Sequence, residues 1–168
     1  MKKYLSCFLI ACTVIAVQVF SESNVSAKSI VDISTTAISN AERNQEFPIP
    51  KLVSLEQISP NQIQISYDRD VDLKLGTKAT NYWIQDTMNF TPKGIATLGK
   101  NEKANANNSL TDNLVKINPV NGLRNTFILT FSKNIPSGKE YKLIICYVTV
   151  QGAPPYSGDN GSATFVGK

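Results

Sequence analysis

Histidine is absent from all 168 residues of the sequence, and this absence excludes a large part of enzyme chemistry. Histidine is the commonest general base near neutral pH and a frequent ligand of zinc and copper. Ser-His-Asp and Cys-His catalytic arrangements therefore cannot form. An enzyme would have to use carboxylate, lysine or tyrosine groups, and the sequence shows no convergent set of them. We expect a protein that is not an enzyme and that needs no cofactor.

Cysteine is nearly as scarce, with three in the chain. Cys7 and Cys12 lie in an apolar N-terminal stretch that we expect to be removed, so that Cys146 alone would remain and no intramolecular disulfide could form. Cys146 falls in an apolar run, which favours a small buried side chain within a strand. An intermolecular disulfide or a reactive thiol is the alternative.

Clustered charge is also lacking. The 17 basic and 13 acidic residues give a net charge of +4. The lysines and arginines are scattered along the chain, without the basic run or the patch of basic and aromatic residues that phosphate backbones require. The sequence therefore argues against a nucleic-acid partner.

The first 27 residues have the pattern of a signal peptide. Lys2 and Lys3 precede an apolar stretch over residues 4–20, and the small residues Ser26 and Ala27 provide a cleavage site. We expect cleavage after Ala27 and a chain that is secreted or held at the cell envelope. The apolar stretch is short and poorly flanked for a stable membrane span, and an uncleaved anchor is one alternative. A lipoprotein is another, because residues 9–12 form a lipobox that ends at Cys12.

Residues 28–50 read as a flexible linker, and residues 51–168 as one all-β domain. Pro48 and Pro50 prevent a helix at the end of the linker and favour an extended start to the domain. Seven or eight short strands, with no convincing amphipathic helix between them, predict an immunoglobulin-like antiparallel sandwich of two sheets, with a closed barrel as the alternative. The expected strands cover residues 52–58, 62–68, 81–85, 94–98, 114–117, 126–132, 141–150 and 162–166.

The pattern of apolar residues also predicts which side chains enter the core. Alternation over residues 62–68 places Ile63, Ile65 and Tyr67 inside. Trp83 is expected to fill the centre of the sandwich. Tyr141 is expected to form a tyrosine corner, in which the hydroxyl bonds back to the backbone of its own corner. Residues 99–113 hold almost nothing that could enter a core, so we expect a long solvated loop there.

Four short motifs are spaced along residues 51–166. They are an aromatic residue followed by polar residues and Val-Asp at 67–72, Asn-Tyr-Trp-Ile at 81–84, Gly-Lys-Glu-Tyr at 138–141, and Asp-Asn-Gly at 159–161. Together they resemble the bacterial immunoglobulin-like domains of S-layer and other cell-envelope proteins. The resemblance implies a sandwich fold and a place at the cell envelope. The chain departs from that pattern in its 99–113 insertion and in the two prolines before Tyr156.

Asp68, Asp70 and Asp72 alternate in the manner of the first ligands of a calcium loop. The remainder of that loop does not match, because its sixth position is Leu73 in place of glycine and its twelfth is Ala79 in place of glutamate. We expect a solvated strand end, and a calcium site on the three carboxylates is the alternative.

The loop before the last strand supplies the candidate binding residues. Tyr156 follows two prolines, and an exposed tyrosine offers a large contact area with a polar handle. Asp159 and Asn160 open the next turn, where turn formation is their first role and ligand contact the second. We assign Tyr156, Asp159 and Asn160 as candidate ligand-binding residues.

The sequence thus predicts a non-catalytic binding or adhesion module that meets a protein or a glycan at a cell surface. It would act through its end loops, chiefly residues 99–113 and 152–161. A self-assembling component of an envelope layer and a secreted hydrolase inhibitor are the alternatives.

Overall fold

The structure, a computed structural model, describes residues 46–168. The predicted signal peptide at residues 1–27, the lipobox cysteine Cys12 and most of the predicted linker lie outside the described residues. The described residues belong to one compact unit, Arg43–Lys168. Both sheets and the buried cluster lie within this unit, so we expect Arg43–Lys168 to fold by itself.

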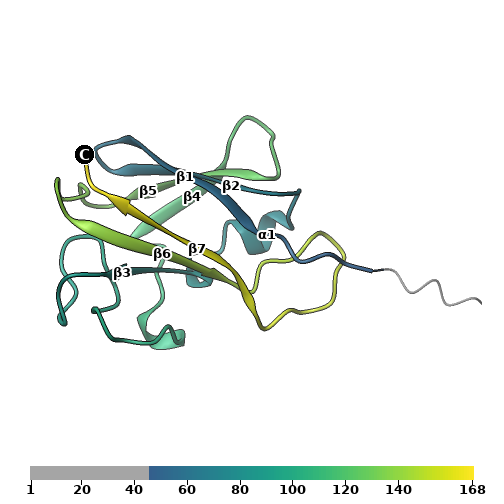
Figure 1. The fold of residues 1–168 in the computed structure, drawn as a ribbon. Helices are drawn as coiled ribbons and strands as arrows, with labels where there is room; N and C mark the ends of the chain where they lie inside the picture. The colour runs from purple at the N-terminus through teal and green to yellow at the C-terminus, as the bar shows by residue number, and fades with distance from the viewer. Residues whose placement is uncertain (1–45) are drawn as a thin grey trace, which may run out of the picture. The chain divides into compact units, whose positions relative to one another are not determined.

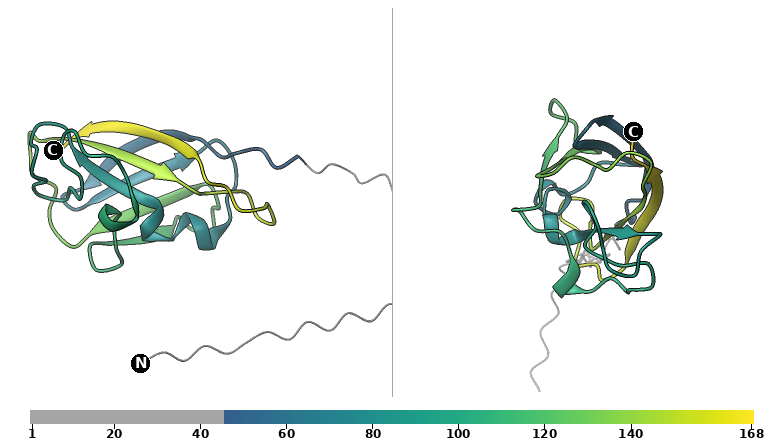
Figure 2. Two further views of the ribbon diagram at one scale, coloured as in Figure 1. Left: turned by 90° about the horizontal axis from the view of Figure 1, so that it is seen from below. Right: turned by 90° about the vertical axis from the view of Figure 1, so that its left-hand side faces the viewer.

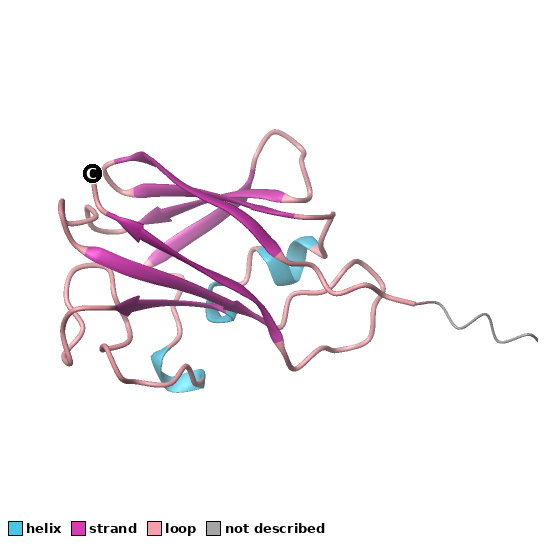
Figure 3. Ribbon diagram, in the orientation of Figure 1, coloured by secondary structure: helices cyan, strands magenta, loops and turns pink. Residues whose placement is uncertain are grey.

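In the described part of the chain, seven strands form two antiparallel sheets that pack face to face (Figures 1 and 3), which confirms the predicted sandwich. One sheet has the order β1-β2-β5-β4 and the other the order β3-β6-β7. This is the strand order of a constant-type immunoglobulin sandwich. The strands are β1 (Leu52–Ser59), β2 (Gln62–Tyr67), β3 (Tyr82–Asp86), β4 (Val115–Pro119), β5 (Thr126–Phe131), β6 (Glu140–Cys146) and β7 (Asp159–Val166).

Within residues 46–168, helix is confined to three short pieces, α1 (Leu73–Gly76), η1 (Ala79–Asn81) and η2 (Ala106–Asn108). Of the helices described, none is long and apolar enough to cross a membrane.

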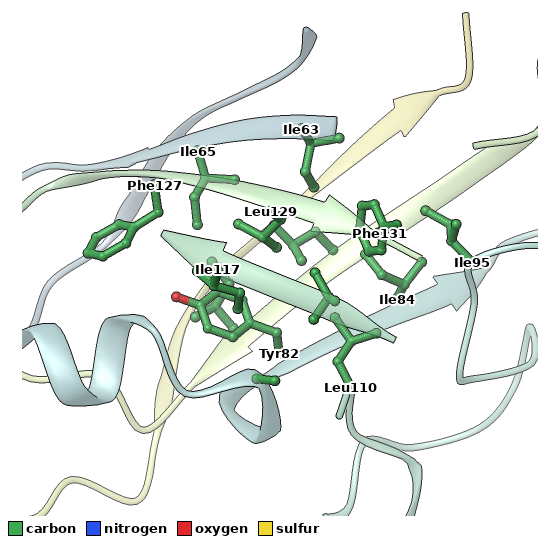
Figure 4. Packing of buried hydrophobic residues seen from close by; sticks show 14 of the residues in the cluster. Ile63, Ile65, Tyr82, Ile84, Ile95, Leu110, Ile117, Phe127, Leu129 and Phe131 are labelled. Carbon is green, nitrogen blue, oxygen red and sulfur yellow. The ribbon is translucent and has the colours of Figure 1, made fainter. Parts of the chain in front are cut away.

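The alternation predicted for the second strand is confirmed. Ile63, Ile65 and Tyr67 of β2 are buried, and the neighbouring strand β5 buries Phe127 and Leu129 on the same side. Figure 4 shows Ile63, Ile65, Phe127 and Leu129 in one cluster with Tyr82 and Ile84 of the opposite sheet. Each fully buried isoleucine or phenylalanine contributes about 1.5–3 kcal/mol relative to an exposed position, so this cluster is the main source of stability.

The connections between strands gather at two ends of the sandwich. The proximal end, where the chain enters β1, comprises residues 46–51 and the β2–β3, β4–β5 and β6–β7 connections. The distal end comprises the β1–β2, β3–β4 and β5–β6 connections and the C-terminus. Figure 2 shows the yellow β6–β7 connection at one end and the C-terminus at the other.

The prediction of a strand at residues 94–98 is wrong. Leu98 makes one isolated parallel bridge with Gln85 of β3, and the segment is otherwise irregular. Ile95 and Leu98 are buried nonetheless. Thr97 and Leu98 share three backbone hydrogen bonds with Ile84 and Asp86 of β3, so the segment joins the sheet only at its end and its apolar residues otherwise serve packing.

Trp83 is buried, but not in the centre of the sandwich as the sequence predicts. Its neighbours Tyr82 and Ile84 enter the central cluster, and Trp83, one residue out of step with them, lies on the other face of β3. Its indole Nε1 donates to Asn105 O at 2.9 Å and to Asn108 Oδ1 at 3.1 Å. The long β3–β4 connection therefore covers Trp83.

The prediction of a solvated loop at residues 99–113 also needs correction, because part of this segment packs against the sandwich. Residues 101–107 are exposed, but Ser109 and Leu110 are buried, and Leu110 belongs to the central cluster. Asn105 and Asn108 form a capping box around η2. Asparagine side chains thus give this polar segment a fixed shape, which its polar composition does not indicate.

Tyr141 is buried at the start of β6, as a tyrosine corner requires, but its hydroxyl bonds elsewhere. It donates to Lys93 O in the β3–β4 connection, at 3.4 Å, and not to its own corner. The adjacent Gly94 has a φ of +67°, and a Cβ at that position would overlap the Tyr141 hydroxyl. Tyr141 therefore fastens the β3–β4 connection to the distal end.

Candidate functional site

The structure brings both groups of predicted site residues to the proximal end. Asp68 opens the β2–β3 connection and Asp159 closes the β6–β7 connection. Lys51 joins them, because its backbone N–H donates to Asp68 Oδ1 at 2.9 Å and its ammonium donates to Asp159 O at 2.8 Å. A further bond runs from Asp72 N to Thr149 O at 2.8 Å. Two loops about ninety residues apart in the chain thus form one surface.

An open hollow of about 490 Å³ lies in this surface. Its walls come from residues 46–48, from residues 69–71 of the β2–β3 connection, from Arg124 of the β4–β5 connection and from residues 150–151 of the β6–β7 connection. Phe47, Val71 and Val150 make part of the lining apolar. Loops from three connections and the chain entering β1 therefore share one concave site.

Arg124 is the residue of this site that the sequence reasoning missed. Its Nη2 donates to the carbonyl of Val71 at 3.5 Å and to the side-chain oxygen of Gln151, so the guanidinium spans two connections. Its Nε is buried without a hydrogen-bond partner. The ion pair found among residues 46–168 joins Arg69 to Asp68, so Arg124 forms no ion pair in the described part of the chain, and the carboxylates that share its hollow are those of Glu46 and Asp70.

Asp68, Asp70 and Asp72, the three carboxylates for which a calcium site was the alternative, each have another role in the structure. Asp68 holds Arg69 in a two-point contact at 2.7 and 3.1 Å. The Arg69 side chain, followed by the backbone N–H of Lys51, lowers the pKa of Asp68. Asp72 caps α1 by accepting the backbone N–H groups of Lys74 and Leu75.

Asp70, the third of these carboxylates, is exposed and lines the hollow. Within residues 46–168, no three acidic or cysteine side chains converge on a point that could hold a metal ion. The alternating aspartates therefore form a turn, a helix cap and a wall of the hollow.

Tyr156 folds back over its own loop. Its hydroxyl donates to Asp159 O at 3.1 Å, and its ring covers Gly158 so closely that a Cβ there would overlap it. The side chain is half-buried. The carboxylate of Asp159 accepts the backbone N–H of Gly161 at 2.7 Å. The exposed part of this loop thus has a fixed form, as a contact surface requires.

Asn160 is fully buried and braces the proximal end from inside. It is the extra residue of a β-bulge, since Ile145 pairs with Gly161 while Cys146 pairs with Asp159. Its Oδ1 accepts Val148 N at 2.9 Å, and its Nδ2 donates to Val148 O at 2.7 Å and to Pro50 O at 2.9 Å. Asn160 is therefore too enclosed to touch a ligand, and it can influence binding only by fixing the shape of the loop.

Cys146 ends β6 and is half-buried, so it is less enclosed than the sequence predicts. Burial, with a smaller contribution from Asp159, raises the pKa of its thiol. The thiolate is the reactive form of cysteine, so this environment lowers the reactivity of Cys146 at neutral pH.

Comparison of the chain with known proteins finds similarity to solved structures alone. No model of a known protein family matches the chain, and no curated protein matches it. Three solved structures are similar to it at 13%, 13% and 16% identity, each over 71% of this chain, with TM-scores of 0.48, 0.47 and 0.46. They are the N-terminal part of the bacterial S-layer protein SbsC, domains 1–6 of SbsC, and the S-layer protein rSbsC(31-844).

The chain spans 23% of the first of these structures and 14% of the other two. The fold assignment rests on the strand order of the chain itself.

Proposed function

We propose that this chain is a non-catalytic binding or adhesion module that acts outside the cytoplasm and holds its partner at the proximal end. The observation that carries the proposal is the convergence of three loops on one open hollow, with Arg124 in its wall. Loops held on a rigid sandwich are the usual place for recognition in folds with this strand order. The class of protein proposed is thus a sandwich domain with a binding surface built from loops.

The chemistry of the hollow suits a partner that carries an acidic group beside apolar surface. Arg124 supplies a cation that forms no ion pair within residues 46–168, and arginine is well suited to carboxylates and sulfates because its donors form a planar fork. Phe47 and Val150 supply apolar contact beside it. An acidic glycan or an acidic protein segment at a cell surface has both features.

The test is a glycan array that contains matched acidic and neutral members, probed with Arg43–Lys168. We expect selective binding of acidic members, about tenfold weaker in Arg124→Gln because one charge-assisted contact is lost. Lys116→Gln is the matched control, since Lys116 is exposed on β4 and outside the hollow. Identical binding profiles for wild type and Arg124→Gln would contradict the proposal.

The place of action rests on the predicted signal peptide. Mass spectrometry of the amino terminus of the exported protein tests it. A mature chain that begins at Lys28 supports release, and a lipidated Cys12 supports a membrane tether. An unprocessed chain that stays in the cytoplasm would contradict action outside it.

A second candidate function, assembly into an envelope layer, has one specific observation in its favour. The outer strands β1 and β7 expose Val53, Ile58 and Val166, at 61%, 43% and 50%. Exposed apolar side chains on edge strands invite pairing with another copy. Size-exclusion chromatography with light scattering separates the two functions, because a monomer at all concentrations excludes assembly through these edges.

A further inference from the structure

Most of the net charge of the described residues lies at the distal end of the sandwich. Its connections, the strand ends beside them and the C-terminus carry Lys93, Lys100, Lys103, Lys133, Lys139 and Lys168 against the carboxylates Asp86, Glu102, Asp112 and Glu140. The proximal connections, residues 46–51, 68–81, 120–125 and 147–159, carry five groups of each sign and are neutral. The molecule is therefore electrically polarised along its strands.

Four of these lysines surround one corner. The β5–β6 connection carries Lys133 and Lys139, and Gly138 N donates to Gly167 O at 2.8 Å, which brings Lys168 to the same corner. Lys93 joins them because its carbonyl accepts the Tyr141 hydroxyl. All four are exposed, and none forms an ion pair within residues 46–168. The corner is thus a basic surface, in which Glu140 offsets one of the four positive charges.

Two large apolar side chains stand on the same end. Met88 and Phe90 are 57% and 72% exposed. Asn89 between them points inward, where its Nδ2 donates to both carboxylate oxygens of Asp86 at 3.1 and 2.9 Å. The residues on either side of this inward anchor are therefore turned to solvent. Thr87 ties the segment to the basic corner, because its hydroxyl donates to Glu140 Oε1 at 2.7 Å.

The shape of this tip is fixed. Asp86 is 3% exposed and accepts the backbone N–H groups of Met88, Asn89 and Lys93. Lys100 N donates to Asn89 O at 2.8 Å, and Gly99 lies so close to Phe90 O that no Cβ would fit. A rigid tip loses little conformational entropy on binding.

We propose that the distal end docks onto an anionic lipid surface, with Met88 and Phe90 at the boundary of the acyl chains and the surrounding lysines on the phosphate groups. The boundary of a bilayer places apolar chains directly beneath its phosphates, which matches apolar side chains beside lysines. A hydrated polyanion would use the lysines and leave the two apolar side chains without a partner. This surface lies at the end opposite the proposed binding site and does not depend on it.

The experiment measures co-sedimentation of Arg43–Lys168 with vesicles of mixed phosphatidylglycerol and phosphatidylcholine. A lysine near an anionic surface contributes roughly fivefold in affinity, so the triple variant Lys93→Gln, Lys133→Gln, Lys139→Gln should bind about a hundredfold more weakly. The control triple Lys74→Gln, Lys78→Gln, Lys116→Gln removes the same charge elsewhere and should keep most of the binding. Equal losses in the two triples would overturn the proposal, since net charge alone would then explain binding.

The apolar half of the proposal has its own matched pair. Phe90→Ser should lower vesicle affinity about tenfold, because it removes one aromatic side chain from the interface. Leu123→Ser, at an exposed position of the proximal end, should change it little. Unchanged binding by Phe90→Ser, or equal binding to phosphatidylcholine alone, would overturn the proposal.

Dextran sulfate separates a lipid from a polymer. Tighter binding to dextran sulfate than to vesicles, unaffected by Phe90→Ser, would also overturn the proposal and assign the surface to a polyanion. Each variant is first required to melt like wild type, with fluorescence of Trp83 as the reporter.

Discussion

Replacement of Asn160 by alanine should cost the sandwich a large part of its stability. The substitution removes three buried hydrogen bonds and leaves Val148 N, Val148 O and Pro50 O without partners. Each buried group left unpaired costs about 1–3 kcal/mol, and some water can enter the vacated space, so we expect a loss of about 3–5 kcal/mol. A domain of this kind has roughly 5–15 kcal/mol in all.

The assay is urea unfolding of Arg43–Lys168, followed by fluorescence of the single tryptophan, Trp83. Ser162→Ala, an exposed position on the same strand, is the control and should change the free energy of unfolding by less than about 0.5 kcal/mol. A loss below about 1 kcal/mol in Asn160→Ala would refute the reasoning, because the three bonds would then be replaceable by solvent.

Asn160→Asp sharpens the same prediction. The side-chain nitrogen donates to two carbonyl oxygens, and a carboxylate oxygen in its place would face both with a negative charge. The aspartate variant should therefore be less stable than the alanine variant at pH 7. Its deficit should shrink on acidification, because the protonated side chain regains one donor. A deficit that does not change with pH would refute this account.

Three further predictions follow from buried polar groups and from the carboxylates. Burial opposes ionisation of Asp86, but hydrogen bonds from Asn89, Met88 and Lys93 outweigh it and lower its pKa from 3.8. A carboxylate with a lowered pKa stabilises the fold fully above about pH 4, and this stabilisation is lost as the pH falls further. Asp86→Ala should therefore lower the free energy of unfolding by about 3 kcal/mol at pH 7 and by less in acid. The same loss in urea titrations at pH 7 and at pH 3 would contradict this. Trp83→Phe removes the indole donor to Asn105 O and Asn108 Oδ1. Amide hydrogen exchange of residues 99–113 should therefore accelerate while that of β2 stays slow. Equal acceleration in both segments would be incompatible with a local role of the Trp83 indole. The melting midpoint should be the same with calcium and with chelator, because Asp68, Asp70 and Asp72 do not converge; a rise with calcium would show an ion bound to the folded state.

The sandwich was predictable because its strands alternate clearly. Ile63, Ile65 and Tyr67 show which face of β2 is buried, and the turns between strands are marked by proline, glycine and asparagine. The error at Trp83 has a physical cause. Three successive residues of β3 are buried, because the sheet has the core on one face and the β3–β4 connection on the other. Alternation cannot assign a strand that is covered on both faces.

The site was predictable only in part. Asp68 and Asp159 were singled out by type, and the strand order then brings their loops together. Arg124 was missed because a lone arginine after an Asn-Gly turn carries no local signal. Its position becomes meaningful only once the β4–β5 connection is known to share an end with the other two. Asn160 was taken for a turn residue, and only the bulge in β7 turns its amide inward.

The opposite placement of the two chain ends in the sandwich has a mechanical consequence. The chain enters β1 at the proximal end and leaves β7 at the distal end, as Figure 1 shows. A force applied between these points pulls β1 along β2 and β7 along β6. Antiparallel hydrogen bonds run perpendicular to the strands, so this force shears the whole ladder at once and does not open it bond by bond. The sandwich is therefore suited to carry tension along its length. We expect unfolding under force to begin with the detachment of an outer strand, β1 or β7.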